Sequence, residues 1–240
     1  MAEVILITSG KGGVGKSVVC GYLGAALASL EKQVLLLEAS RRSLDVLFGV
    51  PDQVVFDLSD AAGGRCSLDD ALLQLGETGR LQLICAPVGG AEPLGPALCG
   101  ELIDALDAHF DFVLVDIDGT RPQELSAYAE PADRAVIVST PDQVSVRDGR
   151  VVSDLLYRCG LEDIRLCVNQ LTADFVRQRP VPDLDWMIDQ VCAQLIAVVP
   201  YDKTLAQIAI TPTFLSNTSK NVFYNFAQRI LGNYIDLLIQ

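Results

Sequence analysis

The stretch Gly10-Lys11-Gly12-Gly13-Val14-Gly15-Lys16-Ser17 decides the fold of this 240-residue chain. It follows the apolar run Val4–Thr8 and opens the helix-length segment Lys16–Leu30. Glycines at these positions let the backbone wrap closely around an anion, so that N–H groups and a helix N-terminus point at phosphate oxygens. The pattern G-x-x-x-x-G-K-[ST] between a strand and a helix therefore predicts a phosphate-binding loop.

Each polar residue of the loop has a predicted contact with a bound nucleotide. Lys16 is expected to bridge the β- and γ-phosphates, and the hydroxyl of Ser17 is expected to ligate Mg²⁺. ATP and Mg²⁺ are therefore the predicted cofactors. The nucleotide-binding residues predicted in this part of the chain are Gly10, Gly12, Gly13, Val14, Gly15, Lys16, Ser17 and Val18.

Strand-like apolar runs alternate with helix-length segments along nearly the whole chain. This alternation predicts one α/β domain over residues 1–240, with a mostly parallel sheet between two layers of helices. The hydrophobic share of 50% agrees with strands buried on both faces. The predicted strands are Val4–Thr8, Gln33–Glu38, Leu81–Ala86, Phe112–Asp116, Ala135–Ser139, Ile164–Asn169 and Leu195–Pro200. The predicted helices are Lys16–Leu30, Leu68–Leu75, Ala97–His109, Gln123–Glu130, Val146–Cys159, Leu184–Gln194 and Asn221–Leu238.

The composition argues against several classes of protein. A net charge of −13 disfavours non-specific binding to nucleic acid or to anionic lipid, because both are polyanions. No apolar stretch reaches the roughly 18 residues of a membrane span, and the N-terminus lacks the features of a signal peptide, so a cytoplasmic protein is expected. Seven cysteines without a Cys-x-x-Cys pair argue against a disulfide framework or a zinc site.

With Lys11, the loop reads Lys-Gly-Gly-Val-Gly-Lys-Ser, and here the chain resembles the MinD/ParA family of deviant Walker A P-loop ATPases. The likeness extends to about Gly232 through segments such as Ser43–Gly49, Val144–Asp148 and Val198–Pro200, and it is stronger to the MinD branch than to the ParA branch. It implies an ATP-dependent homodimer in which Lys11 reaches the phosphates of the partner. It also implies a slow ATPase that acts in placing the division site or in a related spatial task.

Phe112–Asp116 reads as an apolar strand that ends in a carboxylate. The carboxyl edge of a sheet beside a phosphate-binding loop is where an aspartate holds the Mg²⁺ shell, usually through water, so Asp116 is the predicted residue. The family continues with an Asp-Ser-Pro-Ala-Gly-like turn, whereas this chain has Asp116-Ile117-Asp118-Gly119-Thr120. The second switch loop therefore has a different shape, or Asp118 adds an acidic group near the metal.

The strand before Glu38-Ala39-Ser40 ends where the family usually carries Asp-x-Asp. The resemblance implies that the first residue lies near Mg²⁺ and the second orients the attacking water. Glu38 keeps the first charge on a longer arm, but Ser40 loses the second. The predicted metal-site residues are Ser17, Glu38 and Asp116, and the predicted catalytic residues are Lys11, Lys16, Glu38 and Ser40. Two interpretations stay open: a slow ATPase switch, and an ATP-gated binding module with little or no hydrolysis.

Asn169 ends another apolar strand, and its amide offers the donor and the acceptor that the adenine edge needs. The family likeness implies that Asn169 contacts the base, with Pro200 and Asp202 on the other side. It also implies a MinC- or MinE-like regulatory partner that docks on the helix Val146–Cys159. Flagellar-number regulators and plasmid partition proteins remain alternatives within the family.

The last predicted helix, Asn221–Leu238, carries an apolar stripe at helical spacing. In the MinD branch the chain normally ends in a basic amphipathic helix that binds anionic membrane. Here no Lys or Arg follows Arg229. Because each cationic residue near an anionic surface contributes about 1 kcal/mol, membrane contact is expected to be weak or absent.

Overall fold

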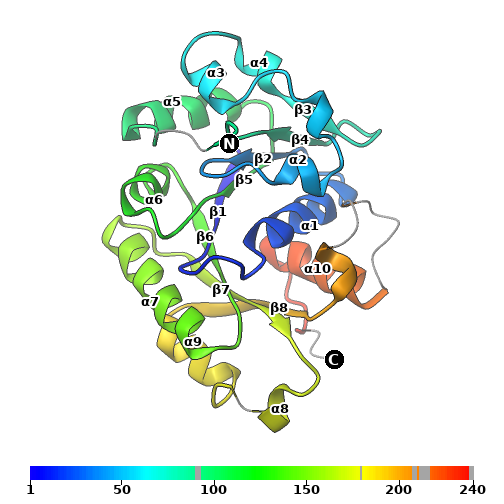
Figure 1. Cartoon of the computed structure of the whole chain (residues 1–240), viewed down its shortest axis with the longest axis vertical. Coiled ribbons are helices and arrows are strands. Elements are labelled where there is room, and N and C mark those ends of the chain that lie inside the picture. The colour runs from blue at the N-terminus through cyan, green and yellow to red at the C-terminus, as the bar shows by residue number, and fades with distance from the viewer. Residues whose placement is uncertain (90–92, 179, 207–209, 211–216, 238–240) are drawn as a thin grey trace.

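The computed structural model of the chain describes residues 1–89, 93–178, 180–206, 210 and 217–237. Within these residues, eight strands form one sheet in the order β3-β4-β2-β5-β1-β6-β7-β8 (Figure 1). All neighbouring strands run parallel except β3 and β4, which pair antiparallel. The strands are β1 Glu3–Thr8, β2 Val34–Glu38, β3 Leu73–Leu75, β4 Leu81–Ile84, β5 Phe112–Asp116, β6 Arg134–Ser139, β7 Ile164–Leu171 and β8 Gln194–Pro200.

Helices cover both faces of the sheet, as Figure 1 shows: α1 and α10 lie on one side, and α5, α6, α7 and α9 lie on the other. The longer helices are α1 Lys16–Ser29, α5 Pro96–Leu106, α6 Pro122–Ala129, α7 Gln143–Arg158, α9 Leu184–Val191 and α10 Asn217–Ile230. Short helical turns are α2 Leu44–Leu47, α3 Leu58–Ala62, α4 Leu68–Ala71, α8 Phe175–Gln178, and the 3₁₀ turns Pro51–Gln53 and Lys203–Ala206.

The core lies in two layers, one on each face of the sheet. Successive residues of a strand point to opposite faces, so Leu6 of β1 belongs to the layer under α5, α6, α7 and α9, and Ile7 to the layer under α1 and α10. Both side chains are fully buried. This two-sided burial is the reason that the strands read as continuous apolar runs, and the predicted α/β fold is confirmed.

One predicted helix is replaced in part by a strand. The segment Leu68–Leu75 begins as the short helix α4, whose N-cap Ser67 exchanges hydrogen bonds with Asp70. The chain then straightens into β3, in which Leu73 and Leu75 pair with β4 at the edge of the sheet. Leu68, Leu72 and Leu75 have helical spacing, whereas Leu73 and Leu75 have the spacing of a strand, so the pattern alone did not separate the two.

The last helix ends eight residues before its predicted end. It begins at Asn217 and stops at Ile230, because Gly232 adopts a φ angle of 82° and terminates it. Residues 233–237 continue without helical structure, and Arg229 donates a hydrogen bond to the carbonyl of Ile235 at 2.5 Å. Leu238, the predicted end, lies outside the described residues. Among the described helices, none is long and apolar enough to cross a membrane.

Candidate functional site

Several predicted residues lie at the carboxyl ends of parallel strands, and these ends share one edge of the sheet. Asp116 of β5 is paired in register with Ile7 of β1 on one side and with Glu38 of β2 on the other. The loops that follow β1, β2 and β5 therefore leave the sheet side by side. Asn169 lies near the end of β7, two strands beyond β1.

The phosphate-binding loop takes its shape from glycines with different roles. Gly13 and Gly15 have φ angles of 81° and 85°, a region that other residues disfavour, and Gly15 caps the N-terminus of α1. Gly10 instead touches α7, because a Cβ there would lie 2.2 Å from the backbone oxygen of Asp148. Gly12 has no atom within 4 Å of such a Cβ. The loop is thus fixed by backbone conformation at one end and by contact with α7 at the other.

A cavity of about 470 Å³ lies over this loop. Among the described residues that line it, the cations Lys11, Lys16, Arg41 and Arg42 face a single carboxylate, that of Asp118. Each of these cations pairs with a carboxylate, and the partners of Lys11, Lys16 and Arg42 lie outside the lining. The surface of the cavity itself therefore carries more cations than carboxylates, which favours an anionic ligand. The predicted residues that line this cavity are Lys11, Gly12, Gly13, Val14, Gly15, Lys16, Ser17, Val18 and Ser40. Asp118, which the sequence offered as an alternative acidic group near the metal, also lines the cavity. The lining residues that the sequence did not single out as site residues are Ser9, Arg41, Arg42, Ser43 and Thr120.

Lys16 and Asp116 form an ion pair at this edge of the sheet. The Lys16 ammonium contacts Oδ1 of Asp116, whose side chain is only 2% exposed. The other carboxylate oxygen, Oδ2, is buried and has no hydrogen-bond partner among the described groups. An unpaired buried acceptor is costly, and it suits a water molecule held by Mg²⁺. Ser17 lies one residue from Lys16 and lines the cavity, so the oxygen donors present fit Mg²⁺.

The structure places Glu38 away from the cavity lining. The side chain is fully buried, and Oε1 accepts backbone hydrogen bonds from Ser43 and Leu44, both at 2.6 Å. Oε2 accepts a third from Ala86 at 3.3 Å. Because both carboxylate oxygens already bind backbone N–H groups, Glu38 fixes the start of α2 and the chain after β4. Its assignment as a ligand of Mg²⁺ is a prediction that this placement does not favour.

Burial raises the pKa of Glu38 to about 7. The hydrogen bonds from Leu44, Ser43 and Ala86 act in the opposite direction, because they stabilise the carboxylate, and the charge of Asp116 raises the pKa further. The proton on Glu38 is therefore bound more tightly in the native state than in the unfolded chain.

Ser40 lines the cavity, and its hydroxyl is engaged inside the protein. Oγ donates a hydrogen bond to Oε2 of Glu124 at 2.8 Å and accepts one from the backbone N–H of Asp118 at 2.9 Å. Glu124 lies in the first turn of α6 and is 1% exposed. Sequence analysis missed Glu124, and no local pattern marks it, because the contact joins residues 84 positions apart.

Lys11 is held by Asp142, the N-cap residue of α7. Its ammonium lies 3.2 Å and 3.3 Å from the two carboxylate oxygens of Asp142. Both side chains are more than one-third exposed, so an ion pair of this kind contributes at most about 1 kcal/mol. The structure therefore holds Lys11 at the cavity by a contact that can be exchanged at small cost.

A second cavity, of about 360 Å³, adjoins the first and shares Gly15 and Val18 with it. It is lined by the predicted residues Asn169, Pro200 and Asp202. The amide of Asn169 donates a hydrogen bond to the carbonyl of Val14 at 2.7 Å, which ties the end of β7 to the phosphate-binding loop. Other residues that line this cavity are Val19, Gln170, Tyr201, Lys203, Leu205 and Phe223.

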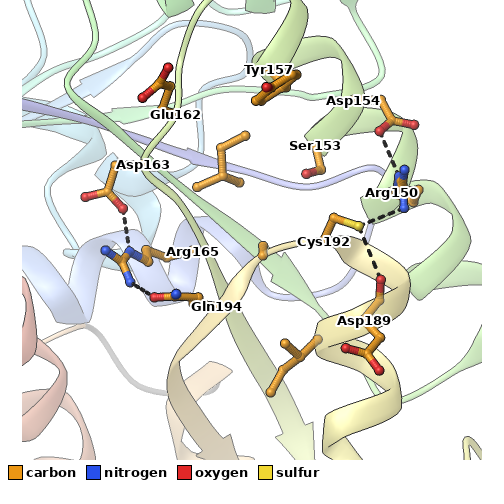
Figure 2. Close-up of a pocket in the computed structure, with 13 residues that line it drawn as sticks. Arg150, Ser153, Asp154, Tyr157, Glu162, Asp163, Arg165, Asp189, Cys192 and Gln194 are labelled. Carbon is orange, nitrogen blue, oxygen red and sulfur yellow. Dashed lines mark hydrogen bonds and ion pairs between the residues drawn. The ribbon is translucent and has the colours of Figure 1, made fainter.

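A third cavity, of about 820 Å³, lies among α7, α9 and the starts of β7 and β8. Figure 2 shows Arg150 of α7 between Asp154 and Cys192, and Tyr157 at the rim. Tyr157 is 70% exposed. None of the phosphate-loop residues lines this cavity, so it is separate from the predicted nucleotide site.

The fold and the paired cavities define the class: a nucleotide-binding protein of the P-loop type, with the loop at the carboxyl edge of a parallel sheet. Residues 1–56 match the ParA family model, described as NUBPL iron-transfer P-loop NTPase. The septum site-determining protein MinD of Bacillus subtilis (strain 168) is 30% identical over 251 residues, which cover 100% of this chain and 92% of that protein. MinD of Thermotoga maritima is also 30% identical, with coverage of 99% and 91%.

Solved structures of MinD proteins superpose on this chain over nearly its whole length. A chain of the MinC:MinD cell division protein complex of Aquifex aeolicus superposes with a TM-score of 0.88 at 28% identity, over 99% of each chain. MinD of Pyrococcus horikoshii OT3 in complex with Mg-ADP superposes with a TM-score of 0.81 at 25% identity, over 96% of each chain. The chain belongs to the family of septum site-determining MinD proteins.

The raised pKa of Glu38 predicts a dependence of stability on pH. Between about pH 4.5 and pH 7 the native state binds this proton more tightly than the unfolded chain, so the free energy of unfolding falls as the pH rises. Relative to the variant Glu38→Gln, wild type is expected to lose up to about 3 kcal/mol across this window and to change little above it. Urea unfolding at pH 5, 6, 7 and 8 measures the difference.

Glu130→Gln is the matched control, because Glu130 is exposed at the end of α6. This variant should keep the wild-type pH profile. Parallel profiles for wild type and Glu38→Gln would contradict the assignment of the titrating group to Glu38.

Proposed function

We propose that this chain is a Mg-ATP-dependent switch that dimerises on ATP, hydrolyses it slowly, and acts in placing the division site or in a related spatial task. One observation carries the proposal: the cationic cavity over the loop and the cavity beside Asn169 meet at Gly15 and Val18. A ligand with phosphates in the first and a base in the second would cross the start of α1. ATP and ADP have this shape and this charge.

Different residues would contact the phosphates, the Mg²⁺ ion and the adenine of the bound nucleotide. The loop N–H groups and the N-terminus of α1 receive the phosphates, and Lys16 exchanges Asp116 for the β- and γ-phosphates. Ser17 and Asp116 would hold Mg²⁺, Asp116 through water. Mg²⁺ supplies charge neutralisation of the phosphates when it is bound. Asn169 holds the loop through Val14 and lines the cavity that receives the adenine.

Lys16→Ala tests the binding site. The change removes a charge-assisted contact to the phosphates, so Mg-ATP affinity measured by calorimetry should fall by well over tenfold. Lys220→Ala removes the same charge from an exposed position on α10 and should leave affinity unchanged. The thermal unfolding of the variant shows whether it is folded. An unchanged affinity in folded Lys16→Ala would refute the site.

Dimerisation depends on Lys11 in this proposal. The ion pair with Asp142 is half-exposed and weak, so Lys11 can leave it for the phosphates of a second subunit. Lys11→Ala should leave ATP binding to the monomer within a few-fold of wild type but abolish dimers in a non-hydrolysable ATP analogue. Analytical ultracentrifugation measures the dimer.

Asp142→Asn is the matched control for Lys11→Ala. Asn is also a good N-cap residue, so this change frees Lys11 without removing the cap of α7. We expect the dimer to form as well as in wild type, or better. Dimers of Lys11→Ala that match those of wild type would exclude the role of Lys11 across the interface.

The second candidate function is an ATP-gated binding module with little or no hydrolysis. The observation that favours it is that both Glu38 and Ser40 are committed to hydrogen bonds within the protein. A phosphate-release assay with and without Mg²⁺ separates a slow ATPase from such a module. Flagellar-number regulators and plasmid partition proteins are further alternatives for the cellular task, and gene neighbours would distinguish them.

A MinC- or MinE-like regulatory protein is the proposed partner, and α7 is the proposed docking helix. The support is the MinC:MinD complex among the similar structures and the surface of α7. Val151 and Tyr157 are 62% and 70% exposed there, and Tyr157 lines the cavity of Figure 2. Exposed aromatic side chains next to a cavity are frequent energetic centres of interfaces.

Tyr157→Ala tests this surface. Affinity for a MinC-like protein from the same genome should fall at least about tenfold, because a central aromatic side chain often contributes 2 kcal/mol or more. Tyr224→Ala, a change of the same size at an exposed position on α10, should have no effect. Equal affinity of both variants, measured by surface plasmon resonance with ATP present, would argue against docking on α7.

The same proposal expects a cytoplasmic protein with weak or absent membrane contact. The net charge is −13, which opposes electrostatic attraction to anionic vesicles. Nucleic acid is not an expected partner for the same reason.

A further inference from the structure

The Ser40 hydroxyl joins the two loops that border the phosphate cavity. It belongs to the loop after β2, it accepts the N–H of Asp118 from the loop after β5, and it donates to Glu124 at the start of α6. Ser40 is 1% exposed and still lines the cavity over the phosphate-binding loop. The hydroxyl is thus a junction between the protein interior and the predicted nucleotide site.

Glu124 is an unusual residue to bury at such a junction. It is 1% exposed, and Oε1 has no hydrogen-bond partner among the described groups. Oε2 accepts from Ser40 at 2.8 Å and from Arg121 at 3.3 Å, and the Arg121 side chain is 40% exposed. A buried carboxylate with one unpaired oxygen costs stability. Features of this kind are found most often where function requires them.

The hydrogen bonds of Ser40 leave one acceptor position open. A hydroxyl has one proton and two lone pairs. The hydroxyl donates its hydrogen bond to Glu124, and one lone pair accepts a hydrogen bond from the N–H of Asp118. The second lone pair remains, on a residue that lines the cavity. Because the carboxylate of Glu124 accepts the hydroxyl hydrogen bond, it polarises Oγ of Ser40. Oγ is therefore a stronger hydrogen-bond acceptor than the hydroxyl of an isolated serine.

We infer that Glu124 is a positioning residue for ATP hydrolysis: it holds and polarises Ser40, so that the free lone pair of Oγ orients the attacking water. The inference rests on the proposed function. Ser40 and Glu124 together supply a charged hydrogen-bond acceptor for the water, as a single carboxylate at position 40 would. The negative charge comes from Glu124, which lies 84 positions further along the chain.

The reaction leaves both residues unchanged. The water oxygen bonds to the γ-phosphorus as the bond from that phosphorus to the β–γ bridging oxygen breaks, and the bonding pair stays on ADP. One hydrogen of the water stays on the oxygen that bonds to phosphorus, and the other ends on another oxygen of the released phosphate. Ser40 only accepts a hydrogen bond from the water, and Glu124 only accepts the hydrogen bond of Ser40.

Moving the carboxylate from position 124 to position 40 tests the inference. Glu124→Gln should lower kcat for phosphate release about tenfold, with KM for ATP within twofold of wild type and no decrease in thermal stability. Ser40→Asp alone should also lower kcat, because it places a second carboxylate against Glu124. The double variant Ser40→Asp/Glu124→Gln should recover at least the wild-type rate.

The decisive feature of this experiment is that Ser40→Asp should lower kcat when residue 124 is Glu and raise kcat when residue 124 is Gln. A role in stability alone would make the double variant as slow as the slower single variant, or slower. Glu130→Gln makes the same chemical change at an exposed position of α6 and should leave kcat unchanged.

A second measurement needs no nucleotide. The N–H of Asp118 binds Oγ of Ser40 at 2.9 Å, so its hydrogen exchange, followed by NMR, reports on the junction. Ser40→Ala should speed this exchange about tenfold or more, and Ser40→Thr, which keeps a hydroxyl, should restore slow exchange. Equal exchange in wild type and Ser40→Ala would show that the junction is not formed and would overturn the inference.

The remaining outcomes are also decisive. An unchanged kcat in Glu124→Gln overturns the inference, as does a double variant that is no faster than the slower single variant. If wild type binds Mg-ATP but releases no phosphate, the inference fails while nucleotide binding stands. If calorimetry detects no binding of Mg-ATP to wild type, the proposed function fails, and the inference fails with it.

Discussion

A parallel sheet buried on both faces has only its strand ends at which to place charge, and the site depends on this constraint. β1 lies between β5 and β6, so its loop leaves the sheet beside the loops of its neighbours. Gly10 and Gly15 let that loop fit between α7 and the end of β7. The nucleotide site is therefore formed where several buried strands end, and its polar residues come from segments far apart in the chain.

Three buried acidic groups near this edge, Glu38, Asp116 and Glu124, do not line the cavity. Glu38 binds backbone N–H groups, Asp116 pairs with Lys16, and Glu124 accepts the hydroxyl of Ser40. Each buried carboxylate has a different partner, and the charge of Asp116 contributes to the raised pKa of Glu38. The cavity itself is left with a cationic lining, although the chain carries a net charge of −13. Local arrangement, not total charge, decides what this surface attracts.

The expected effect of a substitution at Ser40 differs between the sequence and the structure. In the sequence it is the loss of a carboxylate, and restoring that carboxylate would be expected to speed hydrolysis. In the structure a carboxylate is already present 2.8 Å from the hydroxyl, so adding another would place two negative charges together in a buried space. The expected effect of Ser40→Asp therefore depends on Glu124.

The sequence by itself determined the order of the seven parallel strands and of the six longer helices among the described residues, the α/β class, the phosphate-binding loop and the place of Asp116 at the end of a strand. These depend on local patterns: apolar runs, glycine spacing, and a polar residue at a strand end. Only the tertiary structure decided that Leu73 and Leu75 form an edge strand, because Leu68, Leu72 and Leu75 also have the spacing of a helix. It also decided that Glu38 binds backbone and that Glu124 meets Ser40. Such contacts join residues far apart in the chain, and a buried polar group takes whichever partner the packing brings within hydrogen-bond distance.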